Sequence, residues 1–290
     1  SSFRKGNLVN GLAKLKGSSK KIILISSYLC HPSMANNELS GPLSLISIYN
    51  EVKNWKNRRY NYFFLINPET IGSLCFINTY QKLLKKNLVG GLVLTCLGGP
   101  KKKLIYKKSR MNISNFDQIC SVLSDEGTLR IKDFDPADGG SDERQYCSGE
   151  LNLPMGQISR TAPGDYIQYH NSGDDKTFMK ITQVQKSSSD IIKILKINEY
   201  SYALKRYIPF GELMLGKRNL YPNINSHNTR DNYFKNNLDF KIMLNILSYA
   251  DGKNTILDIA KKSKFKLQDL QRVMSFCIKK KLLKGNNLII

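Results

Sequence analysis

An α/β fold with helices on both faces of a sheet, followed by a small helical domain, is predicted by two features of this 290-residue sequence. The first is the alternation of short apolar runs with amphipathic segments, which is typical of strands that alternate with helices. The second is a change of pattern after residue 204, where a segment rich in Asn, Gly and Pro leads into a compact helical run. We therefore predict an α/β domain at residues 1–205, a connector at 206–237 and a winged helix-turn-helix domain at 238–290.

The elements of the α/β domain are predicted in chain order from their apolar spacing. Short apolar runs predict strands at residues 20–29, 60–67, 89–97 and 153–159. Apolar residues that recur every three or four positions predict helices at residues 40–55, 71–86, 113–127 and 178–204. In such a sheet, ligands bind beyond the carboxyl ends of the strands. Polar residues that follow the strands are therefore the candidates for a functional site.

Three helices and a terminal strand are predicted in the C-terminal domain. The first helix ends at Gly252, and its amphipathic pattern predicts four buried side chains: Ile242, Leu244, Ile246 and Leu247. The second is short and begins after a cap at Asn254 or Thr255. The third is longer and predicts five buried side chains: Leu267, Leu270, Val273, Met274 and Ile278. Residues 284–290 could add a turn and a short strand.

Composition narrows the class of protein. The net charge of +22 is compatible with nucleic-acid binding, but the lysines are spread along the chain, so a solvated lysine-rich surface is the simpler explanation. No apolar run reaches about 18 residues, so no membrane span is expected. Six scattered cysteines without a C-x-x-C pair favour free thiols in a reducing cytoplasm. The N-terminus shows no obvious first element, and we expect the chain to be part of a longer protein.

Histidines and carboxylates stand where the predicted strands end. His31 follows the first predicted strand, Glu69 follows the second, Glu143 lies in an acidic glycine-rich segment, and His170 is close to Asp174. Two histidines and several carboxylates at one sheet edge form a donor set that suits zinc. Zinc lowers the pKa of bound water, and Glu69 or Glu143 could accept the proton. The alternative is that each histidine is an ordinary hydrogen-bonded loop residue, because no compact ligand motif is present.

Four motifs together resemble one known family. "CHPSMANNELSG", "PETIGS", "GGSDERQYCS" and "YHNSGDD" occur in the order found in an aminopeptidase-like zinc-peptidase family of bacterial polysaccharide-biosynthesis clusters. The segment "GELMLGKRNLYP" and the winged-helix tail are similar to that family too. The resemblance implies a zinc-exopeptidase-like α/β/α sandwich. It also implies that longer members carry an inserted small domain and additional upstream sequence.

The resemblance assigns roles to individual positions. His31 matches the first metal-binding histidine and His170 the late one. Glu69 matches a glutamate at a strand end that serves as ligand or general base. Asp142 and Glu143 match a loop that lines the site, in which the aspartate acts through hydrogen bonds. We therefore take Glu69, Asp142 and Glu143 as candidate catalytic residues.

One departure from the family pattern affects the metal. The family has an aspartate ligand at the position of Asn37, and a neutral amide is a poorer zinc ligand. A second aspartate is expected where Gly98 and Gly99 stand. Asn37 stays in the candidate ligand set with His31, Glu69 and His170, and the site is expected to hold one zinc at most, or none. Glu38 could substitute, although neighbouring loop residues rarely point the same way.

Three functions are compatible with these residues. The first is a zinc-dependent aminopeptidase-like hydrolase with a weakened metal site, acting on an amide bond of a small or peptide substrate. The second is a non-catalytic member of the family that binds a ligand. The third is a DNA-binding regulator that uses the basic tail, which requires Lys264, Lys266 and Arg272 to form one exposed face. For the tail we favour docking to a protein partner or to the chain's own α/β domain.

Overall fold

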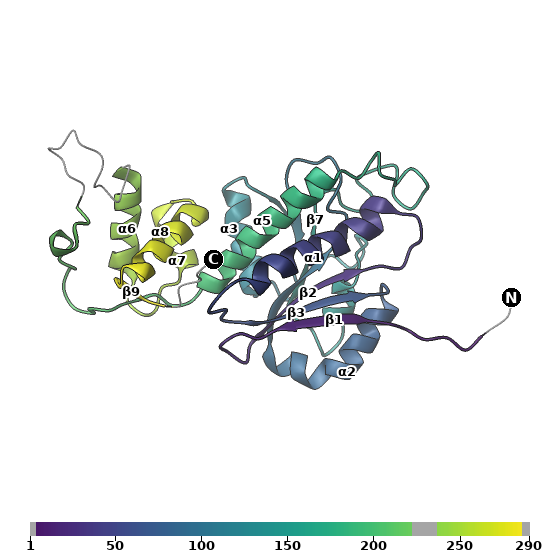
Figure 1. The fold of residues 1–290 in the computed structure, drawn as a ribbon, viewed down its shortest axis with the longest axis horizontal. Coiled ribbons are helices and arrows are strands. Elements are labelled where there is room, and N and C mark those ends of the chain that lie inside the picture. The colour runs from purple at the N-terminus through teal and green to yellow at the C-terminus, as the bar shows by residue number, and fades with distance from the viewer. Residues whose placement is uncertain (1–3, 222–236, 286–290) are drawn as a thin grey trace. The chain divides into compact units, whose positions relative to one another are not determined.

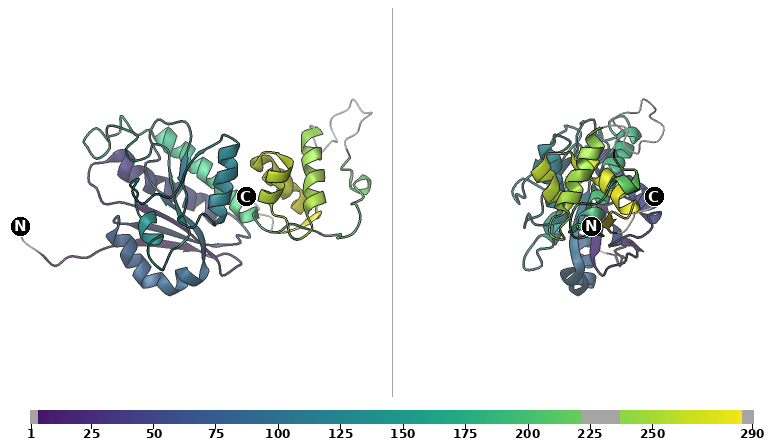
Figure 2. Two further views of the ribbon diagram at one scale, coloured as in Figure 1. Left: turned by 180° about the vertical axis from the view of Figure 1, so that it is seen from behind. Right: turned by 90° about the vertical axis from the view of Figure 1, so that its left-hand side faces the viewer.

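The computed structural model describes residues 4–221 and 237–285, and the chain divides into two compact units after Asn198. The first unit holds an α/β sheet with its helices and the second holds a small helical domain (Figures 1 and 2). The α/β fold class is confirmed. No disulfide forms among the described cysteines. Within the same residues, no helix has the length and apolarity needed to cross a membrane.

The first unit is built on one seven-stranded sheet with the order β1-β3-β2-β4-β7-β5-β6. Its strands are β1 (Gly11–Leu15), β2 (Ile22–Tyr28), β3 (Asn61–Asn67), β4 (Leu88–Leu94), β5 (Ile105–Lys107), β6 (Arg130–Lys132) and β7 (Met155–Ser159). The four central strands run parallel, whereas β1 is antiparallel to β3 and β5 is antiparallel to β7. Every residue of β2 is buried, as expected for a parallel strand covered on both faces.

Helices cover both faces of this sheet. They are α1 (Ser40–Lys53), α2 (Ile71–Asn87), α3 (Asn115–Asp125), the single turn α4 (Glu143–Tyr146) and α5 (Ile181–Tyr200). In Figure 1, α1 and α5 lie side by side on one face and α2 lies on the other. A core cluster beneath α2 joins alternate residues of the strands, such as Leu24, Leu65 and Val93, to Phe76 and Leu84 of the helix.

The four predicted strands and four predicted helices of the first unit are confirmed, but five elements were missed. These are β1, β5, β6, α4 and the π-helical turn η1 (Ala35–Leu39) that precedes α1. The missed strands are short or half-exposed at the sheet edge, so they lack the apolar run that marks a buried strand. Their conformation comes from pairing with neighbours that are distant in sequence.

The second unit has the elements of a winged helix-turn-helix. Its helices are α6 (Asn237–Tyr249), α7 (Ile256–Ser263) and α8 (Leu267–Lys279), and the strands β8 (Lys205–Arg206) and β9 (Leu283–Lys284) pair antiparallel. A short 3₁₀ turn, η2 (Gly216–Arg218), lies between β8 and α6. Thr255 caps α7 in a reciprocal box with Asp258. The predicted strand at 284–290 falls largely outside the described residues, as does much of the predicted connector.

The predicted core of the helical unit needs one correction. The five side chains expected to be buried in α8 are buried. In α6, however, Leu244 is 41% exposed, and Met243 is buried in its place. The buried face follows the spacing Ile242, Met243, Ile246 and Leu247, and Leu244 lies about 200° around the helix from Ile242. The prediction for Leu244 was therefore wrong because apolar character was counted without its angular position.

Arg272 on α8 is held by two carboxylates. Its guanidinium donates to both oxygens of Asp239 at 2.7 Å and 2.7 Å, and to Asp269 at 3.2 Å. The guanidinium holds the pKa of Asp239 below its usual range. A lowered carboxylate pKa gives stability that is present above the usual value and lost as pH falls through the folded one. Of the three cations required for a DNA-binding face, Arg272 is thus already paired.

We expect Asp239→Asn to lower the stability of the helical unit by about 0.5–1 kcal/mol near neutral pH, because the partly exposed pair is screened by solvent. The loss should shrink as the pH falls through the lowered folded pKa of Asp239 and vanish below it, where Asp239 is protonated in the parent chain as well. Calorimetric unfolding of both chains near neutral pH and below that folded pKa measures it. An equal loss at both would show that the hydrogen-bonding shape, and not the charge, is responsible.

Candidate metal centre

The candidate site lies at the carboxyl edge of the central strands. The chain leaves β2, returns through β3 on one side of it, and then returns through β4 on the other side. β2 is therefore a topological switch point, where the connecting segments separate and leave a crevice. His31 follows β2, Glu69 follows β3, and His170 lies in the segment between β7 and α5.

The two histidines predicted as ligands lie beside each other. Their ring centroids are 5.1 Å apart and the rings are tilted by 34°. Tyr169 stacks on His170 at 3.9 Å, which fixes the orientation of that ring. Partial burial and the neighbouring His31 lower the pKa of His170. A neutral imidazole is the form that binds a metal ion.

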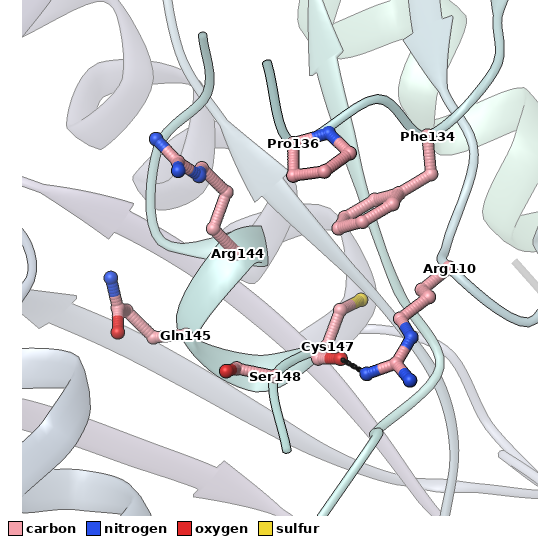
Figure 3. A pocket seen from close by; sticks show the side chains of 7 residues that line it. All are labelled: Arg110, Phe134, Pro136, Arg144, Gln145, Cys147 and Ser148. Carbon is pink, nitrogen blue, oxygen red and sulfur yellow. Dashed lines mark hydrogen bonds between the residues drawn. The ribbon is translucent and has the colours of Figure 1, made fainter. Parts of the chain in front are cut away.

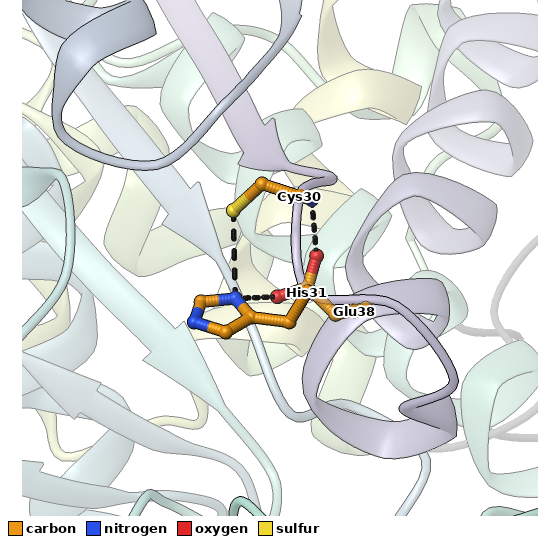
Figure 4. Close-up of side chains that lie close together, drawn as sticks. All are labelled: Cys30, His31 and Glu38. Carbon is orange, nitrogen blue, oxygen red and sulfur yellow. Dashed lines mark hydrogen bonds and ion pairs between the residues drawn. The ribbon is translucent and has the colours of Figure 1, made fainter. Parts of the chain in front are cut away.

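Glu38 supplies the carboxylate at this position. It is fully buried, and its Oε1 lies 2.6 Å from Nδ1 of His31, while its Oε2 accepts the backbone N–H of Cys30 at 2.6 Å. The Cys30 thiol lies 3.4 Å from the same Nδ1. Figure 4 shows the three side chains close together. Their potential ligand atoms all lie within 4.8 Å of one another.

Sequence reasoning placed Asn37 in the ligand set and gave Glu38 little weight. The structure folds this segment into the π-helical turn η1, and the Asn37 amide donates to Glu38 Oε1 at 3.3 Å. The two neighbouring side chains therefore point the same way, contrary to what is usual in a loop. The signal for Glu38 was in the sequence, because the carboxylate missing from position 37 stands one residue later.

Asn37 belongs to a neutral hydrogen-bonded group. Its Oδ1 accepts from the Tyr28 hydroxyl at 2.9 Å and lies 3.7 Å from the Cys96 sulfur. Burial raises the pKa of Cys96 to about 12, and burial also raises the pKa of Tyr28 and of Tyr166. All three groups stay protonated near neutral pH. None of these three groups therefore offers an anionic ligand for a second cation.

The second aspartate of the family pattern has no room here. A Cβ atom on Gly98 would lie 2.4 Å from Cγ of Met179, and one on Gly99 would lie 2.2 Å from the Thr161 hydroxyl oxygen. Either distance is shorter than a contact that real side chains make. The departure from the family pattern at Gly98 and Gly99 therefore includes the packing around these residues. The donor set that remains fits one cation.

Glu69 stands at the same edge with its carboxylate partly covered. Its Oε1 accepts from the Ser141 hydroxyl at 2.6 Å, and its backbone N–H donates to the Cys30 sulfur at 3.3 Å. Burial raises the pKa of Glu69, while the hydrogen bond from Ser141 and the neighbouring His31 oppose that rise. A glutamate with a raised pKa and one fixed hydrogen bond suits proton transfer.

Asp142 and Glu143 face different ways. Asp142 accepts from the Asn67 amide at 2.8 Å, from the Thr70 backbone at 2.7 Å and from the Ser73 hydroxyl at 3.0 Å, so it holds the segment that carries Glu69. Glu143 is fully buried and turned toward Lys107, whose Nζ is 3.6 Å from its Oε1. Its other oxygen accepts the Ser141 backbone N–H at 2.9 Å. Both side chains therefore act within the protein interior.

Asp174 joins the His170 segment to η1 and was given no such role by sequence reasoning. Its carboxylate accepts the backbone N–H groups of Asn36 at 2.6 Å and Asn37 at 3.0 Å. A carboxylate at the start of a helix is favoured by the unpaired N–H groups there. Because it also fixes the segment that carries His170, Asp174 sets the spacing between the two histidines.

Strained backbone marks the same region. Thr70, Cys96 and His170 adopt left-handed φ values of 63°, 50° and 59°. Such conformations cost a non-glycine residue about 1–3 kcal/mol and persist only where surrounding contacts impose them. All three residues lie just beyond central strands or in the segment facing them, which supports a functional role for this edge.

The sheet order, the helix layers and the residues at the carboxyl edge define an aminopeptidase-like α/β domain, joined to a winged helix-turn-helix. The chain belongs to the family described as "Domain of unknown function (DUF4910)", whose model matches residues 2–201. A winged helix-turn-helix family model matches residues 202–285. The predicted resemblance to an aminopeptidase-like family with a C-terminal winged helix is thereby confirmed.

Known proteins agree with this assignment. A Clostridium acetobutylicum protein, described as a candidate polysaccharide biosynthesis protein with an aminopeptidase-like domain, is 34% identical over 286 residues, which are 98% of this chain and 63% of that protein. A crystal structure of a candidate peptidase from Clostridium acetobutylicum has a TM-score of 0.79 at 31% identity, covering 95% of this chain and 60% of the other. The chain thus spans less than two thirds of either relative.

A more distant similarity concerns the fold alone. The zinc aminopeptidase BSAP from Bacillus subtilis has a TM-score of 0.52 at 15% identity, covering 64% of this chain and 48% of that one.

Proposed function

We propose that this chain is a zinc-dependent, aminopeptidase-like hydrolase that holds one zinc ion and acts on an amide bond of a small or peptide substrate. The observation that carries the proposal is the pair of adjacent imidazoles of His31 and His170, with the buried Glu38 carboxylate against one of them. Nitrogen and carboxylate donors with one position left for water are the usual set of a catalytic zinc site. The aminopeptidase-like family and fold support a peptidase-like hydrolase.

The residues around the site have separable tasks. His31, Glu38 and His170 would hold the ion, which would polarise the scissile carbonyl and make water more acidic. Glu69 accepts the proton from the attacking water and returns it to the leaving amine, because burial brings its pKa closer to neutral pH. Ser141 orients the Glu69 carboxylate through its hydroxyl. Asp142 positions the segment between Asn67 and Ser73 that carries Glu69.

Changing Glu69 to glutamine tests the proposal. We expect hydrolysis of aminoacyl-p-nitroanilides by the zinc-loaded chain to fall by about 10²–10⁴-fold, the usual contribution of a general base, while zinc content is retained. The exposed Glu150 is a matched control, and Glu150→Gln should leave the rate unchanged. If the parent chain binds zinc but hydrolyses no aminoacyl substrate, the non-catalytic alternative replaces this proposal.

A further inference from the structure

A cavity separate from the candidate metal centre lies beside α4. It has a volume of about 420 Å³ and lies between α4 and the segment after β6 (Figure 3). That size is within the range of about 300–1,000 Å³ that small-molecule sites occupy. Arg144 and Gln145 line it from α4, Arg110 and Ser148 from the adjoining segments, and Phe134 from the segment after β6.

Arg110 is anchored at this cavity with much of its donor capacity unused. Its Nη1 donates to the backbone carbonyl oxygens of Cys147 at 3.2 Å and Gly149 at 3.5 Å. Within the part of the chain that the structure describes, its Nε and Nη2 have no protein acceptor. A guanidinium fixed by one nitrogen presents its remaining N–H groups in a rigid fork that suits carboxylate or phosphate oxygens.

Arg144 brings a second uncompensated charge. It follows Glu143 in sequence, but the Glu143 carboxylate is buried on Lys107. Over residues 4–221 and 237–285, no carboxylate lies within ion-pair distance of either Arg110 or Arg144. Figure 3 shows the Arg144 guanidinium at the opposite side of the cavity from that of Arg110. The two positive charges therefore attract an anion to the cavity without forming one clamp.

The remaining lining residues indicate which group the anion would carry. Phe134 presents an aromatic ring beside Pro136, and Gln145 and Ser148 add a side-chain amide and a hydroxyl (Figure 3). We propose that this cavity binds a small organic anion, with its phosphate or carboxylate held by Arg110, a flat apolar group against Phe134, and Arg144 adding electrostatic attraction from the opposite side of the cavity. The proposal does not depend on the hydrolase assignment, since no candidate metal ligand lines this cavity.

Calorimetric titration with four probes tests the site: phenyl phosphate, benzoate, inorganic phosphate and phenol. Work at about 0.15 M salt screens attraction by the net charge beyond about 8 Å. We expect phenyl phosphate to bind more tightly than inorganic phosphate, because the ring adds contacts, and phenol not to bind. Tighter binding of phenyl phosphate than benzoate identifies a phosphate ligand, and the reverse identifies a carboxylate.

Variants locate the binding. Arg110→Gln should weaken binding of the preferred probe about tenfold, as loss of a charge-assisted contact does, and Arg144→Gln should weaken it less. Arg110→Lys keeps the charge and checks that any loss is not misfolding. Arg130→Gln, at the exposed start of β6, removes one charge away from the lining and should have no effect. Equal weakening by Arg130→Gln, or unchanged binding in Arg110→Gln, would overturn the proposal.

Discussion

Replacing Glu38 with glutamine should lower the zinc affinity of this chain by about 100-fold or more. Changing a group that only supports a metal ligand costs about 10–100-fold in metal affinity. Glu38 is proposed as a ligand itself, and its oxygen is 2.6 Å from Nδ1 of His31, so the loss should reach the upper end of that range or exceed it. The substitution preserves shape and removes the buried negative charge that would balance a cation. Competition with a chromogenic chelator near neutral pH measures the affinity. The Glu150→Gln chain is the matched control.

Moving the carboxylate from position 38 back to position 37 tests whether this carboxylate holds the ion. In the double variant Asn37→Asp with Glu38→Asn, the charge returns to position 37, and we expect zinc binding to recover relative to Glu38→Gln. Asn37→Asp alone should raise zinc occupancy above that of the parent. If Glu38→Gln binds zinc as well as the parent does, Glu38 is not part of a metal centre, and the displaced carboxylate has no role in holding the ion.

The long elements of the fold could be predicted because their pattern is local. β2 is buried along its whole length, and helices such as α2 show apolar residues at helical spacing. The strands β5 and β6 have three residues each, and α4 has four, so no period can be recognised within them. These elements depend on pairing and packing with distant segments, which a local pattern does not contain.

Some residues of the candidate site could be predicted from local patterns and others could not. His31 and Glu69 follow strands that were recognisable, so their placement at one edge could be inferred from the fold class. The direction of Glu38 depends on the π-helical turn, and that turn is held by Asp174 through backbone contacts across more than a hundred residues. A constraint over such a distance is invisible in the local sequence. The surroundings of Asn37 were unpredictable for the same reason, because Cys96 contacts it from the segment after β4 and Tyr166 contacts Cys96 in turn.

Asp142→Ala should destabilise the α/β unit by about 3 kcal/mol, because two buried donors and one partly buried donor lose a charged acceptor at once. Each such bond contributes about 1–3 kcal/mol before compensation. Part of this is offset, since burial raises the pKa of Asp142 and its ionised form is costly to bury. The single tryptophan, Trp55, is buried in the same unit, so its fluorescence during urea unfolding reports the change. Ser73→Ala, which removes one of the three donors, should cost about 1 kcal/mol.

The same variant should also release Glu69. Thr70 is held at a φ of 63° by the hydrogen bond from its backbone N–H to Asp142, and without that bond the backbone can relax to a less strained conformation. Glu69 is the preceding residue, so its carboxylate would then leave the Ser141 hydroxyl. We expect any zinc-dependent hydrolysis to fall in Asp142→Ala more than in Ser73→Ala, at a temperature where both chains stay folded. A stability loss under about 0.5 kcal/mol, typical of an ordinary surface change, would show that Asp142 does not hold this segment.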